Sequence, residues 1–444
     1  MIASVIGKTF LKEYNRREKT DYSAEEFFDK IYHPLFYDHE KYMQWMTNSP
    51  FVQGYRSASP PDKTIRLEKL ANLKQKISGD DEPDASFAIG FPAAGETGTT
   101  SGQVTTLSPV VEDEDIYASW IGGGLGIGIK GGFSIYFNHP EILWKVYEGW
   151  NLYRNFLEEY DNLRPNQIDT WNGQWFSYAC SKEFNAAFPE TGMRNALEPA
   201  AGGNIQFKTQ QWTEVMFGIA RQFKESQITG YVFSLGQMNT TIGFIPFELP
   251  DIARPLQFYS ELFGENDFLD STTKITRMYG TAHSFRSACQ KGVIGTSALE
   301  PKDLVQYMQP RRGRAKTPDF RNADQEKEIT FKVYQTWLLA MLNNKELWDH
   351  ADNAAKAYLE YVEGSKKASR QRTNAIDQIL DATNKRTFIE ANIEVIENAE
   401  GVAQKISDIV EQIHLMPEDN FRYFKTLIKF RYAFWKNQQQ GENL

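Results

Sequence analysis

The C-terminal quarter of the chain is the segment that most restricts its fold. Residues 326–440 contain one proline, Pro417, and two glycines, and their apolar residues recur at intervals of three and four. This spacing lines the apolar side chains along one face of a helix, and almost no residue there would interrupt a helix. Because the segment is much longer than a single globular helix, it predicts a bundle of several helices over residues 326–444.

The preceding three hundred residues have a mixed pattern. Residues 1–75 and 141–160 place apolar side chains at helical spacing. Residues 85–137 are rich in glycine, threonine and β-branched side chains, so we predict a glycine-rich β segment there. Two further strands are predicted within residues 228–247, with a hairpin turn at 236–240. The predicted fold class is therefore α+β, with antiparallel hairpins and helices followed by an all-α bundle.

A basic segment separates the two predicted regions. Residues 308–325 are polar and basic, and Pro310, Gly313 and Pro318 interrupt them. We predict an N-terminal α+β domain over residues 1–307, a linker over residues 308–325, and the helical bundle beyond it.

A glycine motif raises the question of nucleotide binding. Gly126, Gly128 and Gly131 satisfy G-x-G-x-x-G, but residues 133–137 read as a strand, whereas a dinucleotide loop opens a helix. The kinase signatures H-R-D and D-F-G are also missing from the sequence. The favoured interpretation is a glycine-rich β-hairpin packed against a neighbouring sheet. A loop lying along a nucleic-acid or partner backbone is the competing functional interpretation.

No catalytic or metal-binding pattern emerges from the remaining sequence. The six histidines are scattered without zinc-ligand spacing, the cysteines are Cys180 and Cys289 alone, and no G-x-S-x-G motif occurs. We therefore expect a protein without enzymatic activity, metal or cofactor. No apolar run approaches the about 18 residues of a membrane span, and the N-terminus does not resemble a secretion signal, so a cytoplasmic protein with no membrane partner is expected.

Basic residues gather in the C-terminal third although the net charge is −9. Residues 421–436 hold five basic residues and no acid, and four of them fall on one helical face: Arg422, Lys425, Lys429 and Lys436. Either a solvated face or contact with phosphates would account for this pattern. Other candidates for contact with a nucleic-acid backbone are Arg311, Arg312, Arg314, Lys316, Lys366, Lys367, Arg370 and Arg372.

Two polar segments complete the list of candidates. The hairpin turn presents donors and acceptors that suit base edges or phosphates: Gln237, Asn239, Thr240 and Thr241. In TWNGQW, residues 170–175, we favour a polar turn anchored by core tryptophans over a binding role for Asn172 and Gln174.

Four parts of the sequence resemble one known family. They are FLKEYNRREKTDYSAEEFF with HPLFYDHEKYMQW, TTSGQVTTLSP with DIYASWIGGGLGIGIKGG, the TWNGQW box, and SLGQMNTTIGFIPF. Together they resemble the large subunit of type I CRISPR (Cascade) surveillance complexes of the I-A and I-B branch. The resemblance covers most of residues 1–300.

The resemblance implies a subunit without enzymatic activity. Such a subunit contacts the handle of the guide RNA (crRNA) and the backbone, handle-binding and small subunits. It also recognises the flanking motif (PAM) of double-stranded target DNA and stabilises the opened R-loop, while guide pairing reads the remaining sequence. The C-terminal bundle is then similar to a small subunit. An effector nuclease of antiviral defence, or proteins of RNA-guided transposition, would be further partners.

On this resemblance we expect the flanking motif to be contacted by residues on predicted turns: Gln237, Asn239, Thr240, Thr241, Gln103 and Lys130. Some members of the branch carry paired C-x-x-C zinc motifs, which this sequence lacks, so no metal is carried over. Two alternatives stay open. One is a nucleotide-binding enzyme that uses the glycine-rich loop, and the other is a purely structural protein-interaction subunit.

Overall fold

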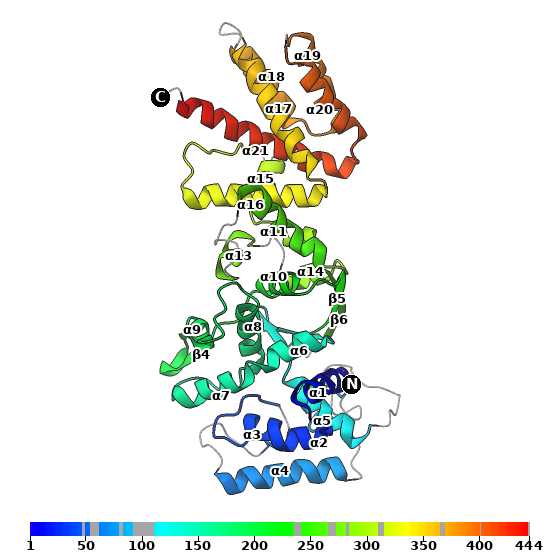
Figure 1. Ribbon diagram of the computed structural model, residues 1–444, viewed down its shortest axis with the longest axis vertical. Helices are drawn as coiled ribbons and strands as arrows, with labels where there is room; N and C mark the ends of the chain where they lie inside the picture. The colour runs from blue at the N-terminus through cyan, green and yellow to red at the C-terminus, as the bar shows by residue number, and fades with distance from the viewer. Residues whose placement is uncertain are drawn as a thin grey trace. The chain divides into compact units, whose positions relative to one another are not determined.

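The computed structural model consists of two compact units (Figure 1). Unit 1 comprises Met1–Phe247 and Cys289–Val293, and unit 2 comprises Glu248–Ala288 and Ile294–Leu444. The structure describes residues 1–46, 49–53, 62–79, 83–91, 111–234, 241–264, 272–280, 284–309, 315–364, 369–399 and 401–442.

Unit 1 combines helices with two small sheets, as the α+β prediction required. Its described helices are α1 (Ile2–Glu18), α2 (Ala24–Phe27), the π-helix η1 (Phe28–Tyr32), α3 (His33–Phe36), α4 (Lys63–Ser78), α5 (Asp113–Gly123), α6 (Pro140–Tyr147), α7 (Trp150–Glu159), α8 (Ile168–Ala179), α9 (Pro189–Arg194), the 3-10 helix η2 (Ala201–Gly203) and α10 (Trp212–Gln222). Its strands are β1 (Ile127–Ile129), β2 (Phe133–Phe137), β3 (Leu197–Pro199), β4 (Ile205–Phe207), β5 (Gln227–Ser234) and β6 (Thr241–Glu248).

Helices α1 and α5 cross at their small residues. A Cβ on Gly7 would lie 1.9 Å from the carbonyl oxygen of Ala118, and a Cβ on Gly122 would lie 1.9 Å from that of Ala3. The two backbones therefore touch, which only glycine at both positions allows. The prediction of β structure over residues 85–137 is wrong for α5, where Gly122 serves a helix crossing, and for residues 85–91, which form no strand.

The main sheet has the strand order β1-β2-β5-β6. Strands β1 and β2 form an antiparallel hairpin, and β2 pairs antiparallel with β5 from Phe133 opposite Ser234 to Phe137 opposite Gly230. The predicted strands at 228–235 and 241–247 are confirmed as β5 and β6. The predicted turn at 236–240 lies outside the described residues.

The TWNGQW segment lies within α8, so the predicted turn is wrong. Trp171 and Trp175 are buried, as predicted. A Cβ on Gly173 would lie 2.1 Å from the carbonyl oxygen of Gly128, so this helical glycine permits the close approach of β1. The fully buried Asn172 donates hydrogen bonds to the carbonyls of Gly124 and Gly126, at 2.8 and 2.9 Å. Its role is to hold the backbone between α5 and β1.

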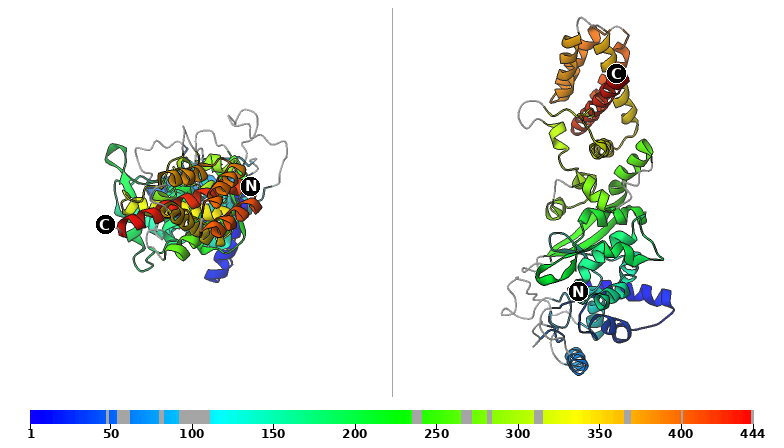
Figure 2. Two further views of the ribbon diagram at one scale, coloured as in Figure 1. Left: turned by 90° about the horizontal axis from the view of Figure 1, so that it is seen from above. Right: turned by 90° about the vertical axis from the view of Figure 1, so that its left-hand side faces the viewer.

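Unit 2 is helical, and the predicted bundle is present (Figures 1 and 2). Its described helices of four residues or more are α11 (Leu249–Phe263), α13 (Thr272–Met278), α14 (Phe285–Cys289), the 3-10 helix η3 (Thr296–Leu299), α15 (Val305–Met308), α16 (Gln325–Leu342), α17 (Glu346–Glu363), α18 (Ser369–Asp381), α19 (Lys385–Glu397), α20 (Ala403–Leu415) and α21 (Glu418–Glu442).

The boundary between the units differs from the predicted one at residue 307. The indole of Trp337 in α16 donates to the carbonyl oxygen of Thr296 at 3.0 Å, and the hydroxyl of Tyr334 donates to that of Lys302 at 2.8 Å. These contacts attach the segment before the predicted linker to the bundle. Among the described residues, no helix has both the length and the apolar character needed to cross a membrane.

Candidate nucleic-acid interface

One end of the main sheet brings two predicted site regions together. Lys130 is exposed in the turn between β1 and β2, where Gly131 and Gly132 adopt φ values of 105° and 76°. The turn leads directly into Phe133, which pairs with Ser234, the last residue of β5. Ser234 therefore lies at the same end of the sheet as the Lys130 turn. Gln237, Asn239 and Thr240 belong to the β5–β6 connection but, like Gln103, lie outside the described residues.

Thr241 begins β6 at this end of the sheet. Its hydroxyl lies 3.3 Å from the hydroxyl of Tyr231 in β5. Beside them, the ring of Phe244 is 5.3 Å from that of Tyr231 and is 63% exposed. The exposed ring of Phe244 suits base stacking, whereas Tyr231 is half-buried. Phe244 was not predicted as a site residue. Its alternation with buried Ile245 and Phe247 would have placed it on the outward face of the strand.

The first two glycines of the G-x-G-x-x-G motif have packing roles. A Cβ on Gly126 would lie 2.4 Å from both Asp169 Oδ1 and Ser134 Oγ, and a Cβ on Gly128 would lie 2.6 Å from the backbone of Asp169. The motif leads into β2, as predicted, and not into a helix. The hairpin interpretation is confirmed, and the geometry gives no support to a phosphate-binding loop.

Two carboxyl groups with raised pKa values lie in unit 1, and sequence reasoning missed both. Glu214 in α10 is only 5% exposed, and burial raises its pKa to about 8 against the opposing charge of Lys208. Burial raises the pKa of Asp169 to about 7, while the hydrogen bond that Ser134 Oγ donates to it at 3.0 Å acts in the opposite direction. Both groups favour the neutral form in the folded chain.

The predicted basic face of α21 is wrong for its two central lysines. Lys425 is 5% exposed and donates to the carbonyl oxygen of Ala382 at 2.9 Å, and burial lowers its pKa to about 8. Lys429 is 2% exposed, forms an ion pair with Asp381 at 3.0 Å, and also donates to Ala315. The reason is that α21 packs against α16, α17 and α18, so this face points into the bundle.

The same helix holds a third buried cation that sequence reasoning did not single out. Arg431 is 7% exposed, and its Nε donates to Asp352 Oδ1 at 2.7 Å. The indole of Trp435 donates to the same oxygen at 2.6 Å. The sequence did offer a signal, since residues 421–436 contain no acid. Any cation of this segment that is buried must therefore pair with a carboxylate from another helix.

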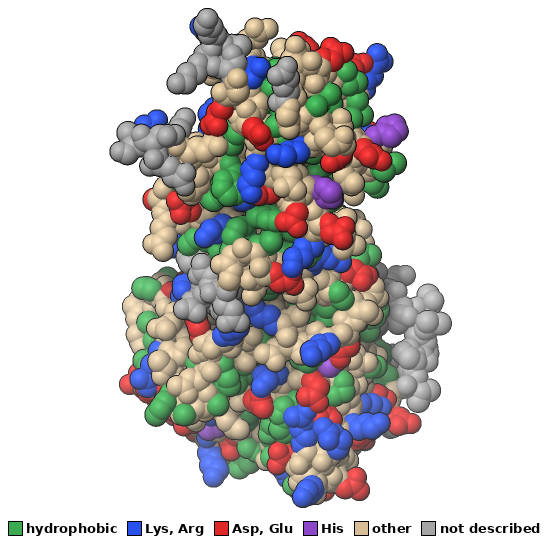
Figure 3. Space-filling model, turned by 45° about the horizontal axis from the view of Figure 1, so that its top comes forward, with side chains coloured by type: hydrophobic (Ala, Val, Ile, Leu, Met, Phe, Trp, Pro, Cys, Tyr) green, Lys and Arg blue, Asp and Glu red, His purple; other side chains and the backbone are tan. Residues whose placement is uncertain are grey.

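The remaining predicted basic residues are distributed as follows. Arg422, Lys436, Lys316 and Arg370 are exposed, whereas Arg372 is half-buried and donates to the carbonyl oxygen of Tyr361 at 2.7 Å. Outside the described residues lie Arg311, Arg312, Arg314, Lys366 and Lys367. On the face in Figure 3, Lys and Arg side chains are interspersed with Asp and Glu.

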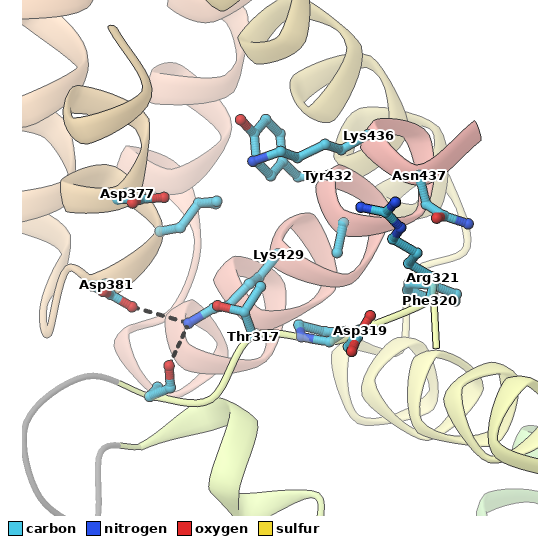
Figure 4. Close-up of a pocket in the computed structure, with 14 residues that line it drawn as sticks. Thr317, Asp319, Phe320, Arg321, Asp377, Asp381, Lys429, Tyr432, Lys436 and Asn437 are labelled. Carbon is cyan, nitrogen blue, oxygen red and sulfur yellow. Dashed lines mark hydrogen bonds and ion pairs between the residues drawn. The ribbon is translucent and has the colours of Figure 1, made fainter. Parts of the chain in front are cut away.

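Unit 2 contains a cavity of about 290 Å³ between residues 315–321, α18 and α21 (Figure 4). Asp377 and Asp381 lie on one side of it, and Arg321 and Asn437 lie on the other. The side chain of Lys436 extends towards the ring of Tyr432, with its Nζ 5.8 Å from the ring centre.

No protein-family model, curated protein or solved structure matches this chain.

Proposed function

We propose that the chain is the large subunit, without enzymatic activity of its own, of a type I RNA-guided complex. In this role it binds the guide RNA and recognises the flanking motif of the DNA target. The sequence resemblance motivates the proposal. The observation that carries it is the sheet topology, in which the Lys130 turn leads into Phe133 and Phe133 pairs with Ser234, the last residue of β5 before the predicted motif-reading residues.

The chemistry at this end of the main sheet suits the role. Lys130 supplies an exposed cation for a phosphate, Thr241 supplies a hydroxyl, and Tyr231 and Phe244 supply aromatic rings. Phosphate contacts would position the duplex, while polar side chains of the β5–β6 connection would read the base edges. Guide pairing would read the rest of the target.

Replacing Gln237 and Asn239 together by alanine is expected to remove recognition of the flanking motif. The wild-type complex should bind a target with the motif more tightly than one without it, and the variant should lose roughly tenfold or more of this preference. Equilibrium binding of the assembled complex to matched DNA duplexes measures the effect.

The matched control replaces Gln53 and Asn195, an exposed Gln and Asn of unit 1 outside this sheet end. The control should keep the full preference for the motif. If the Gln237 and Asn239 variant discriminates as well as the control, the assignment of these residues is wrong. An assembled complex in which this chain contacts neither RNA nor DNA would instead indicate a purely structural subunit.

A further inference from the structure

The cavity in unit 2 has the size of a site for one small molecule. Its volume of about 290 Å³ is close to the lower end of the range for small-molecule pockets, roughly 300 to 1,000 Å³. A nucleic-acid duplex cannot enter such a space, but a single nucleotide can. The cavity lies beside the basic helix α21, whose exposed cations include Lys436.

Two cations of the cavity are available to an anionic group. Arg321 and Lys436 are exposed, and no carboxylate among the described side chains forms an ion pair with either. Lys429, in contrast, is occupied by its ion pair with Asp381. A guanidinium and an ammonium group on one cavity are well suited to bind a phosphate.

The wall provides groups for the rest of a nucleotide. Tyr432 is 4% exposed, and its hydroxyl has no hydrogen-bond partner among the described residues. A buried polar group of this kind is destabilising unless a ligand or water completes its hydrogen bond. On the side opposite Arg321 lie Asp377 and Asp381, and Asp381 already accepts from Lys429 Nζ at 3.0 Å.

We infer that this cavity binds one unpaired nucleotide of the nucleic acid held by the chain. The phosphate contacts Arg321 and Lys436, and the base lies beside Tyr432, whose hydroxyl forms a hydrogen bond with it. The inference rests on the proposed function and adds to it a specific site for a base of a single strand. A free mononucleotide has the same chemistry, so the test must separate the two sources.

The test compares binding of single-stranded DNA, duplex DNA and AMP to the full chain. Arg321→Gln and Lys436→Gln should each weaken binding of the single strand by about tenfold, and Tyr432→Phe by about fivefold. For each cavity variant, binding of duplex DNA should change no more than it does for the control variants. The matched controls are Arg386→Gln and Lys405→Gln, two exposed cations of unit 2 outside the cavity.

An abasic position moved along the single strand provides a second readout. When the abasic position is the one that enters the cavity, the strand should bind more weakly, and Tyr432→Phe should have no further effect on its binding.

If the wild-type chain binds the single strand and the cavity variants bind it equally well, the inference is wrong while the proposed function stands. If the variants no longer bind AMP but still bind the single strand as tightly as the wild-type chain, the ligand of the cavity is a free mononucleotide, and the assignment to a nucleotide of a strand is wrong. If neither the chain nor its complex binds any nucleic acid, the proposed function fails and the inference with it.

Discussion

Replacing Gly122 by alanine is expected to destabilise unit 1 by roughly 3–5 kcal/mol. The new Cβ would lie 1.9 Å from the carbonyl oxygen of Ala3 and 2.9 Å from the backbone nitrogen of Gly7. Both contacts are with backbone, so no side-chain rotation can relieve them, and α1 would have to move away from α5. Helix propensity alone would predict the opposite sign, because alanine favours a helix over glycine by about 1 kcal/mol.

The control is Gly218→Ala in α10, where the new Cβ would meet side-chain atoms alone, the Cβ of Cys180 at 3.2 Å and the ring of Phe176 at 4.0 Å. This substitution should change stability by less than about 1 kcal/mol. Urea unfolding followed by circular dichroism measures both variants, and Gly7→Ala provides a second test of the same contact. Because Gly7 and Gly122 share that contact, the double variant should cost less than the sum of the two. A Gly122→Ala protein as stable as wild type would contradict the crossing.

Replacing Glu214 by glutamine is expected to stabilise unit 1 at alkaline pH by up to roughly 5 kcal/mol. Burial raises the pKa of Glu214 to about 8 in the folded chain, against 4.5 as its ordinary value. The folded state therefore binds one more proton than the unfolded state between these two values. Stability from this group is full below pH 4.5, falls as pH rises through the window, and is lost above about pH 8.

Glutamine has the same shape but no proton to lose, so the variant should lack this part of the pH dependence. Hydrogen exchange in peptides from α10, at the acid end of the window and above pH 8, measures the effect. Asp169→Asn should act in the same direction in peptides from α8, since burial raises the pKa of Asp169 to about 7. If the protection of α10 amides from exchange in the wild-type chain does not decline between pH 4.5 and about pH 8, Glu214 is not a buried ionisable group.

Local pattern was sufficient to predict much of the fold. The helical spacing of residues 326–440 gave the bundle, and β-branched and aromatic residues gave β5 and β6. The glycine-rich turn at Lys130 was also predicted as part of a hairpin. These features depend on neighbours in sequence, which a single sequence displays directly.

The errors came from contacts between distant segments. Gly122 and Gly173 look like breakers of helices, but each lies in a helix because another backbone approaches it there, that of Ala3 or of Gly128. Nothing in the residues around either glycine reveals that partner. Tertiary packing therefore reversed the local preference in α5 and α8.

The basic helix illustrates a different limit. Its periodicity correctly placed four cations on one face, but periodicity does not tell whether a face points to solvent or into the bundle. In α21 the central Lys425 and Lys429 are buried by neighbouring elements, while Arg422 and Lys436 near the two ends remain exposed. The candidate contacts to phosphates on this helix are accordingly reduced to these two exposed residues.

The central claim is that this chain contacts nucleic acid at one end of its main sheet. Ultraviolet crosslinking of the assembled complex to guide RNA and target DNA, followed by mass spectrometry of the crosslinked peptides, tests it most directly. The proposed function predicts crosslinks in the peptide that contains Lys130 and in the peptide that spans the β5–β6 connection and Phe244. An assembled complex that binds its target with no crosslink in either peptide would contradict it.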